Sequence, residues 1–211
     1  MTDSSETGPG PGRRRGRPPS TSRAELERLA ITLFLERGFE ETTVDDIAAE
    51  AGIGRRTFFR YFSSKNEVPW GEFDANISRM QVLLEQLPAE RGVLDALREA
   101  VLDFNRVDAR EAPWLHRRMR LILTVPTLQA HSMLKYGQWR QAVADFVAER
   151  LGADPADLVP QAVGWAALGV SIAAYEQWLA HPEHDLAELL DRAYRQLALG
   201  FDEGAPVLAT G

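Results

Sequence analysis

The stretch from Thr43 to Lys65, TVDDIAAEAGIGRRTFFRYFSSK, constrains the fold of this chain more than any other. It predicts two short helices joined by a tight turn. Thr43 is a suitable N-cap, because its hydroxyl can accept a backbone N–H and two aspartates follow in the first turn. Gly52 can adopt a positive φ and end the first helix. The second helix is expected to begin at Gly54.

The second helix of this pair has two unlike faces. Phe58 and Phe62 are spaced one turn apart, so one side can pack into a small core. Arg56 and Arg60 have the same spacing on another side, and residues 54–65 carry a local charge of +4 in a chain of net charge −7. Such a helix suits the DNA major groove, where Arg can bind guanine O6 and N7. The alternative is a solvated basic helix without a partner.

The charge of the chain is unevenly distributed. Residues 13–65 hold eleven basic and eight acidic side chains, whereas residues 66–211 hold thirteen basic and twenty-one acidic ones. The net charges are therefore +3 and −8. This asymmetry favours a small DNA-binding head on a larger acidic body.

Several function classes are disfavoured by what the sequence lacks. The chain has no Cys, which excludes disulfides and thiol catalysis, and it has neither a Gly-x-Ser-x-Gly motif nor a phosphate loop. We therefore expect no enzyme activity and no cofactor. His181 and His184 flank the helix-breaking Pro182, which predicts a surface turn and no metal site. The apolar run Ala162–Tyr175 is shorter than the roughly 18 residues of a membrane span, so we expect a cytoplasmic, nucleoid-associated protein without a membrane partner.

The first twenty residues are rich in Gly, Pro, Ser and Arg, and residues 1–20 are expected to form a disordered basic arm. A flexible Arg-rich segment can lie in an A·T-rich minor groove, where the potential is most negative. Arg15 and Arg17 are the candidates for this contact. A solubilising tail is the alternative, but the position directly before the helix-turn-helix favours the arm.

The rest of the chain predicts an all-α protein. A first helix capped by Thr21 or Ser22 and ended by Gly38 completes a three-helix head, the DNA-binding domain of residues 21–66. A head of this size is marginal alone, so we expect it to pack against the larger body. Residues 67–211 would form a helical ligand-binding and dimerisation domain, with helices expected at 64–87, 93–106, 112–123, 127–151, 155–179 and 186–201.

The penultimate helix of this body is rich in small residues and apolar on more than one side, so we expect it to be buried. With the Leu-rich last helix it would form half of an intermolecular four-helix bundle in a homodimer. The alternative is a core helix of a monomer, but one head would bind only half a DNA site.

A family resemblance rests on a series of spaced residues in the head. The chain resembles the head of tetracycline-repressor-type (TetR family) regulators over about residues 22–70, through Gly38-Phe39-x-x-Thr42-Thr43-Val44-x-x-Ile47-Ala48-x-x-Ala51-Gly52-Ile53 and Thr57-Phe58-Phe59-Arg60-Tyr61-Phe62-x-x-Lys65. The resemblance implies an all-helical homodimer that binds an inverted-repeat operator in double-stranded DNA and is released by a ligand held in a divergent body.

The resemblance also implies roles for single residues. Thr43 and Lys65 match phosphate contacts of the family. The groove-facing positions are Arg55, Arg56, Thr57, Phe59, Arg60 and Tyr61. Two positions depart from the family pattern: Gly54 replaces a Ser or charged cap, and Arg56 replaces a small residue. We therefore expect an operator that differs from familiar ones.

The ligand is the least constrained part of the prediction. The segment RRTFFRYFSSKNEVPWGEFD is similar to the corresponding segment of the regulators that accompany mycofactocin biosynthesis genes. This resemblance implies a small apolar or long-chain acyl-CoA-type effector. Large apolar side chains of the body are either core residues or pocket candidates: Trp114, Met119, Ile122, Met133, Trp139, Phe146 and Trp165. Cations that could meet an acidic ligand, or simply face solvent, are Arg117, Arg118, Arg120 and Lys135.

Together these features predict a ligand-responsive, sequence-specific transcriptional regulator that acts as a repressor. The alternative function is an architectural DNA-binding protein, in which the arm dominates DNA binding and the body only dimerises. A sequence-specific footprint separates the two.

Overall fold

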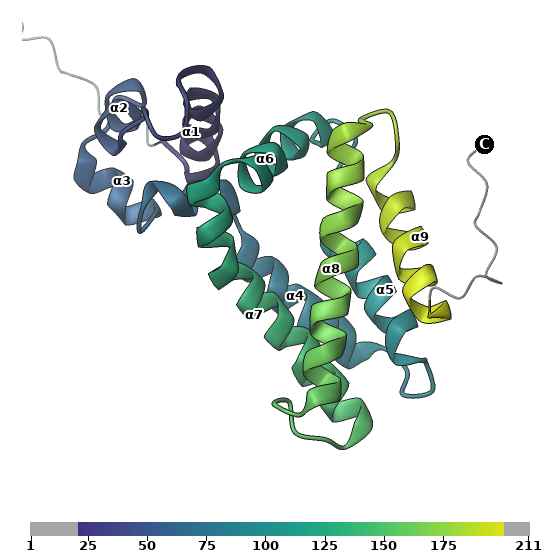
Figure 1. Ribbon diagram of the computed structural model, residues 1–211. Helices are drawn as coiled ribbons and strands as arrows, with labels where there is room; N and C mark the ends of the chain where they lie inside the picture. Colours follow the sequence, from purple (N-terminus) through teal and green to yellow (C-terminus); the bar gives the residue numbers. More distant parts are fainter. Residues whose placement is uncertain (1–20, 201–211) are drawn as a thin grey trace, which may run out of the picture.

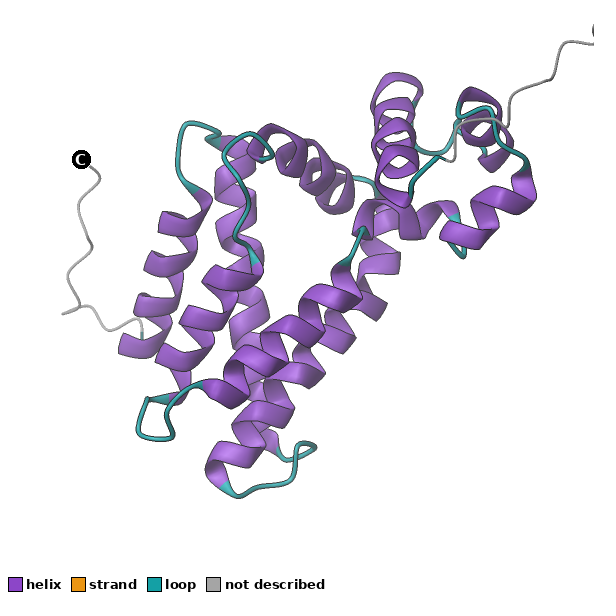
Figure 2. Ribbon diagram, turned by 180° about the vertical axis from the view of Figure 1, so that it is seen from behind, coloured by secondary structure: helices purple, strands orange, loops and turns teal. Residues whose placement is uncertain are grey.

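The computed structural model describes residues 21–200, and every regular element in this range is a helix, with no strand (Figure 2). The elements are α1 Arg23–Arg37, α2 Val44–Glu50, α3 Arg55–Tyr61, the 3₁₀-helix η1 Lys65–Trp70, α4 Phe73–Gln86, α5 Val93–Phe104, α6 Ala112–Thr124, α7 Pro126–Leu151, α8 Leu158–Ala180 and α9 Leu186–Leu199. The predicted all-α class is confirmed.

Capping side chains define the starts of the first two helices of the head, as the sequence predicts. Ser22 forms a capping box with Glu25 at the start of α1, and Thr43 forms another with Asp46 at the start of α2. Gly52, with a φ of 64°, leads the chain out of α2. The α3 helix ends at Tyr61, one residue earlier than expected, because the next residue has an extended backbone.

The continuous helix expected at 64–87 is wrong. The chain forms η1 instead, turns at Gly71 and begins α4 only at Phe73. Pro69 lies inside η1 and has no N–H to donate to an α-helical hydrogen bond. Gly71 has a φ of 51°, a positive value that glycine adopts readily and that ends the helical path. The helical connection between head and body is therefore interrupted at Gly71, and we call this position the joint.

The body packs its helices around one core. α7 and α8 converge toward the bottom of the view, α8 lies along α9, and α5 packs against both α9 and α4 (Figure 1). α6 crosses from the head to the end of α8 (Figure 1). Pro126 occupies the first turn of α7, where a missing N–H costs nothing. The α8 helix begins at Leu158, later than expected, with Asp157 as its N-cap.

The core of the head is shared with the body. Buried side chains of α1, α2 and α3 surround Phe34 and Phe58. Leu121 of α6 and Leu128 of α7 belong to the same buried cluster and are 5% and 0% exposed. The head therefore packs against the body, as its small size predicts.

The α8 helix is apolar but only partly covered within one chain. Leu158 and Trp165 are 82% and 50% exposed, whereas Ala167 and Ala174 are buried against its neighbours. By length and composition α8 could cross a membrane, with a mean hydropathy of 1.4 over its most apolar window. Core helices of soluble proteins pass the same test, and here α8 packs between α7 and α9.

Candidate DNA-binding surface and ligand cavity

The α3 helix is anchored on one side and open on the other. Phe58 and the adjoining Phe62 are buried in the head core, 0% and 2% exposed. On the opposite side the predicted groove-facing residues Arg55, Arg56, Phe59 and Arg60 are exposed, and Thr57 and Tyr61 are half-buried. One shallow surface depression is lined by Arg56, Thr57, Phe59 and Arg60. The structure thus brings these four residues to one face.

The residues of this face differ in how far they are held by other side chains. Arg55 donates to Asp45 of α2 at 2.8 Å. Tyr61 donates its hydroxyl to the Thr21 carbonyl at 2.7 Å, and Arg60 lies over the Tyr61 ring. Arg56 forms no hydrogen bond or ion pair within residues 21–200. Arg56 is therefore the side chain whose guanidinium is most available to an external partner.

Thr43 and Lys65, the predicted phosphate contacts, are both engaged inside the head. Thr43 donates its hydroxyl to Asp46 at 2.5 Å and accepts the Asp46 N–H at 3.1 Å. The Lys65 ammonium donates to the carbonyls of Phe39 at 2.7 Å and Thr42 at 3.2 Å, and it lies 4.4 Å from the Phe39 ring centre. Lys65 thus fixes the loop that leads into α2. A phosphate contact by either residue remains a prediction.

We expect Lys65→Met to destabilise the head. Its ammonium satisfies carbonyls that precede α2, and a hydrogen bond to a charged group contributes about 1.5–3 kcal/mol. The free energy of unfolding, measured by urea titration followed by circular dichroism, should fall by about this amount. Arg56→Met, which removes an exposed cation without internal partners, should leave it unchanged. Equal stabilities for the two variants would show that the carbonyl contacts of Lys65 contribute nothing.

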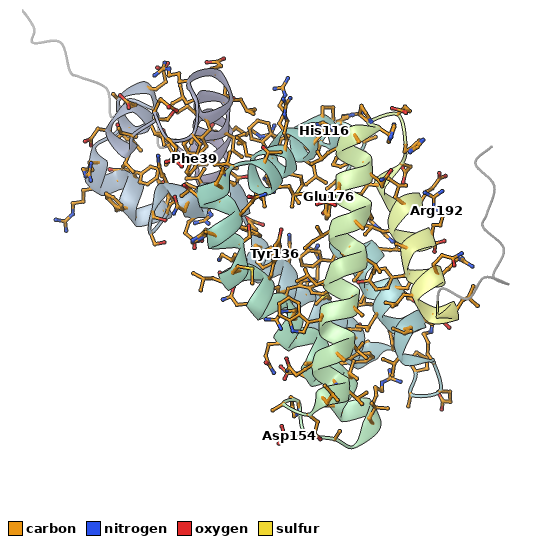
Figure 3. All side chains as sticks on the ribbon, viewed as in Figure 1. Phe39, His116, Tyr136, Asp154, Glu176 and Arg192 are labelled. Carbon is orange, nitrogen blue, oxygen red and sulfur yellow. The ribbon has the colours of Figure 1, made fainter. Side chains whose placement is uncertain are left out.

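The body encloses a cavity of about 290 Å³ among α4, α6, α7 and α8. Three of the predicted pocket residues line it: Met119, Ile122 and Trp139. Tyr136, labelled on α7 in Figure 3, is also part of the wall. The cavity therefore forms where the connecting segment, α6 and the two long helices meet. We call it the inner cavity.

The other four pocket candidates lie away from the inner cavity. Trp114 packs against the head core, and Phe146 is buried in the core of the body. Met133 is 56% exposed on α7. Trp165 is half exposed, with the Arg140 guanidinium 3.6 Å from its ring centre. Each candidate has the side-chain type of a pocket residue, but none of the four lines the inner cavity.

Several residues that line the inner cavity were not predicted from the sequence. Trp70 and Phe73, next to the joint at Gly71, line the inner cavity, although the sequence suggested only a linking helix for them. Tyr175 of α8 also lines it and donates its hydroxyl to Asn105. Burial raises the pKa of Tyr175, so the phenol stays protonated and remains a donor. Only the tertiary arrangement brings these residues to one space.

A second, wider hollow adjoins the inner cavity, and we call it the outer groove. Its volume is about 1,270 Å³, and it shares Asn105, Arg106, Val107 and Leu115 with the inner cavity. His116 on α6 and Arg192 on α9, both labelled in Figure 3, lie on its wall. The outer groove also contains Arg117, one of the predicted ligand-binding cations.

Within residues 21–200, no group of three or more His, Asp or Glu side chains is arranged to hold a metal ion. Arg15 and Arg17 lie outside the described residues. Lys135, another predicted ligand-binding cation, is buried and pairs with Glu67 and Asp74, each at 3.2 Å. Its charge is therefore already matched inside the chain.

The helix-turn-helix has an exposed basic face and is joined to a helical body that contains a cavity. This combination defines a class of DNA-binding protein with a separate effector-type body. Comparison with known proteins makes the class specific. Residues 28–68 match the family described as bacterial regulatory proteins, tetR family, and residues 91–202 match the MftR C-terminal domain. The chain belongs to the TetR family of transcriptional regulators.

Relatives with similar sequences agree with this assignment. The chain is 44% identical over 187 residues to MftR of Mycobacterium tuberculosis, named for the regulation of mycofactocin biosynthesis, with 89% of this chain and 94% of that protein covered. It is 32% identical to the regulator TcmR of Streptomyces glaucescens, with 89% and 85% covered. The predicted resemblance, including that to the mycofactocin-associated branch, is confirmed. Because the family consists of non-enzymatic regulators, the prediction that the chain is no enzyme is confirmed too.

Solved structures show the same fold. FadR of Thermus thermophilus, a TetR-family repressor in complex with lauroyl-CoA, superposes with a TM-score of 0.56 at 24% identity and covers 90% of this chain and 100% of its own. FadR of Bacillus halodurans, a regulator of fatty acid degradation, gives a TM-score of 0.60 at 15% identity, with 83% and 97% covered.

Proposed function

We propose that the protein is a repressor that binds an inverted-repeat operator as a homodimer and releases it when an acyl-CoA-type effector enters the body. The observation that carries this proposal is the position of the inner cavity, whose wall includes Trp70 of the segment that joins head and body. In this proposal residues 1–20 are the basic arm, 21–66 the DNA-binding domain and 67–211 the effector and dimer domain, and the protein acts on the nucleoid in the cytoplasm.

The exposed side of α8 supports the homodimer. An uncovered stripe along this helix has helical spacing and contains Leu158, Ala162, Trp165, Gly169 and Ala173. Exposed apolar stripes on a helix mark surfaces that another helix covers. Two copies of α8 and α9 can form a four-helix bundle around a two-fold axis. Such a dimer would place its α3 helices about 34–36 Å apart, or a longer multiple of the DNA turn.

The two hollows support an effector with an apolar chain and a large polar part. The volume of the inner cavity, about 290 Å³, lies at the lower end of the roughly 300–1,000 Å³ typical of ligand pockets. An acyl chain would fill it, while the adjoining outer groove offers Arg106 and Arg117 to phosphate groups. The alternative function, that of an architectural DNA-binding protein, does not require a cavity next to the head.

Titration with acyl-CoA tests the proposal. Dodecanoyl-CoA should weaken operator binding by at least about tenfold, which corresponds to about 1.4 kcal/mol of coupling. The operator should weaken dodecanoyl-CoA binding by the same factor, because linkage is reciprocal. Anisotropy of a labelled duplex, selected by the protein from random DNA, and calorimetry of the ligand measure the two factors.

A chain-length series from butanoyl-CoA to octadecanoyl-CoA sets the limits of this test, with coenzyme A alone as control. If no member changes operator affinity or binds the protein, the acyl-CoA effector is wrong. If the protein selects no particular duplex from random DNA, the architectural alternative replaces the repressor.

A further inference from the structure

Two side chains that line the inner cavity each carry a buried nitrogen donor without an acceptor among residues 21–200. Trp70 Nε1 and Arg118 Nε are buried without a hydrogen-bond partner among residues 21–200, and both residues line the cavity. Nearly all buried polar groups in native proteins are hydrogen-bonded. Indole and guanidinium nitrogens only donate, so the partner that suits both is an acceptor atom such as an oxygen.

Arg118 also links the body to the head. Its Nη2 forms an ion pair with Glu27 Oε1, which lies on α1 and is 6% exposed. Burial raises the pKa of the Glu27 carboxyl, and the positive charge of Arg118 is the strongest influence that opposes this shift. Removing one partner of a buried ion pair leaves the other charge uncompensated. Arg23 and Arg28 add weaker favourable charges, so Arg118 is the main but not the only cation that keeps Glu27 ionised.

The ion pair lies against the joint between head and body. A Cβ atom on Gly71 would lie 3.0 Å from Glu27 Oε2 and 3.4 Å from Arg118 Nη1. The Gly71 carbonyl accepts a hydrogen bond from Arg23 Nη2 at 3.0 Å, and the Nη1 of the same arginine donates to the carbonyl of Tyr61, the last residue of α3. A continuous series of contacts thus leads from the cavity wall to the DNA-binding helix.

We propose that the inner cavity binds an amphipathic ligand through an acceptor oxygen at Arg118 and Trp70, and that this oxygen competes with Glu27 for the Arg118 guanidinium. This inference rests on the proposed function and names the chemistry that drives release. The shared chemistry is a carboxylate or a thioester carbonyl at the end of an apolar chain. A ligand that takes Arg118 leaves Glu27 buried without its strongest counter-charge, so the head moves away from α6 and carries the Gly71 contacts with it.

Glu27→Gln tests the competition directly. The amide keeps the size of the side chain but no longer competes as an anion, so dodecanoate and dodecanoyl-CoA should bind at least about fivefold more tightly, within the usual range of coupling factors. The coupling between either probe and the operator should fall toward a factor of one. Calorimetry of the probes and anisotropy of the labelled duplex measure both quantities.

Glu111→Gln is the matched control. Glu111 also forms an ion pair with α1, through Arg28, but both side chains are about half exposed and neither lines the inner cavity. Removal of this exposed pair should leave probe affinity and coupling at wild-type values. A control variant that behaves like Glu27→Gln would show that any weakened contact between head and body has the same effect, and would overturn the inference.

Arg118→Met tests the ligand chemistry. Wild-type protein should bind dodecanoate in preference to dodecylamine, which has the same chain but a cationic end, and the variant should lose at least about tenfold of this preference. A purely structural role for Arg118 would weaken both probes equally. Trp70→Phe, which removes only the indole donor, should also weaken dodecanoate selectively. If Arg118→Met does not fold, Trp70→Phe and Glu27→Gln decide the question.

The outcomes separate this inference from the proposed function. If wild-type protein releases the operator with either probe but the variants keep wild-type affinities and coupling, the role of Arg118 is wrong and the proposed function stands. If neither these probes nor any member of the acyl-CoA series acts on wild-type protein, both fail. Release by dodecanoate alone identifies a free acid as the ligand, and release by dodecanoyl-CoA alone identifies the thioester.

Discussion

Replacing Arg56 and Arg60 together with alanine is expected to abolish specific operator binding. The two guanidinium groups lie one helical turn apart on the open face of α3 and line the same surface depression. A bidentate contact between Arg and guanine contributes about 1–3 kcal/mol, and a dimer would lose two such contacts at each half-site. Affinity should therefore fall by at least about a hundredfold, since about 1.4 kcal/mol corresponds to a factor of ten.

Fluorescence anisotropy of the selected duplex measures this loss, while circular dichroism and sedimentation report helicity and dimerisation. Alanine is a strong helix former, so both should stay unchanged. Arg110→Ala with Arg120→Ala removes the same charge from exposed positions of the body and is the control. An Arg56/Arg60 variant that shifts the operator like wild type would show that α3 does not read DNA.

Gly169→Glu is expected to separate the dimer into monomers. A Cβ at Gly169 meets no atom within 4 Å, so the larger side chain fits the single chain, and Glu has a higher helix propensity than Gly. In the proposed bundle, however, a charge would enter the covered stripe of α8 and lose its hydration. One head then binds one half-site, and operator affinity should fall by roughly 10²–10⁴ because bivalent binding is lost.

The matched control for the dimer is Gly137→Glu on α7. A Cβ at Gly137 also meets no atom within 4 Å, and the change in charge and helix propensity is the same. Light scattering should give the mass of a dimer for the control and of a monomer for Gly169→Glu. A Gly169→Glu protein that remains dimeric would place the interface on another surface.

The head could be predicted from the sequence because its signals are local. Thr43 as N-cap, Gly52 at a positive φ and the buried Phe58 each follow from a few neighbouring residues, and the structure shows all three. The engagement of Lys65 with backbone carbonyls was not predicted, because its partners precede it by more than twenty residues. The same limit explains why the break in the connecting helix was not predicted, because no neighbouring residue indicated the positive φ of Gly71.

The cavity could be predicted only in part, because it depends on which helix faces meet. Periodicity marks Trp114, Met119 and Trp139 equally as apolar, yet only the last two reach the inner cavity. Arg118 was one of four cations that the sequence left open between ligand and solvent. Its pairing with Glu27 joins residues ninety-one positions apart, a contact that no sequence pattern specifies.

The shared core of the head bears on how such regulators can be rebuilt. Leu121 and Leu128 belong to the buried cluster of a head whose own helices end at Tyr61. A chimera that exchanges only the first sixty-odd residues between two regulators would set foreign side chains against these leucines and leave a gap or a clash. Transplanting DNA specificity onto a new sensor therefore requires exchange of the matching face of α6 and the first turn of α7 as well. Grafting only the exposed residues of α3 leaves the packing between head and body unchanged.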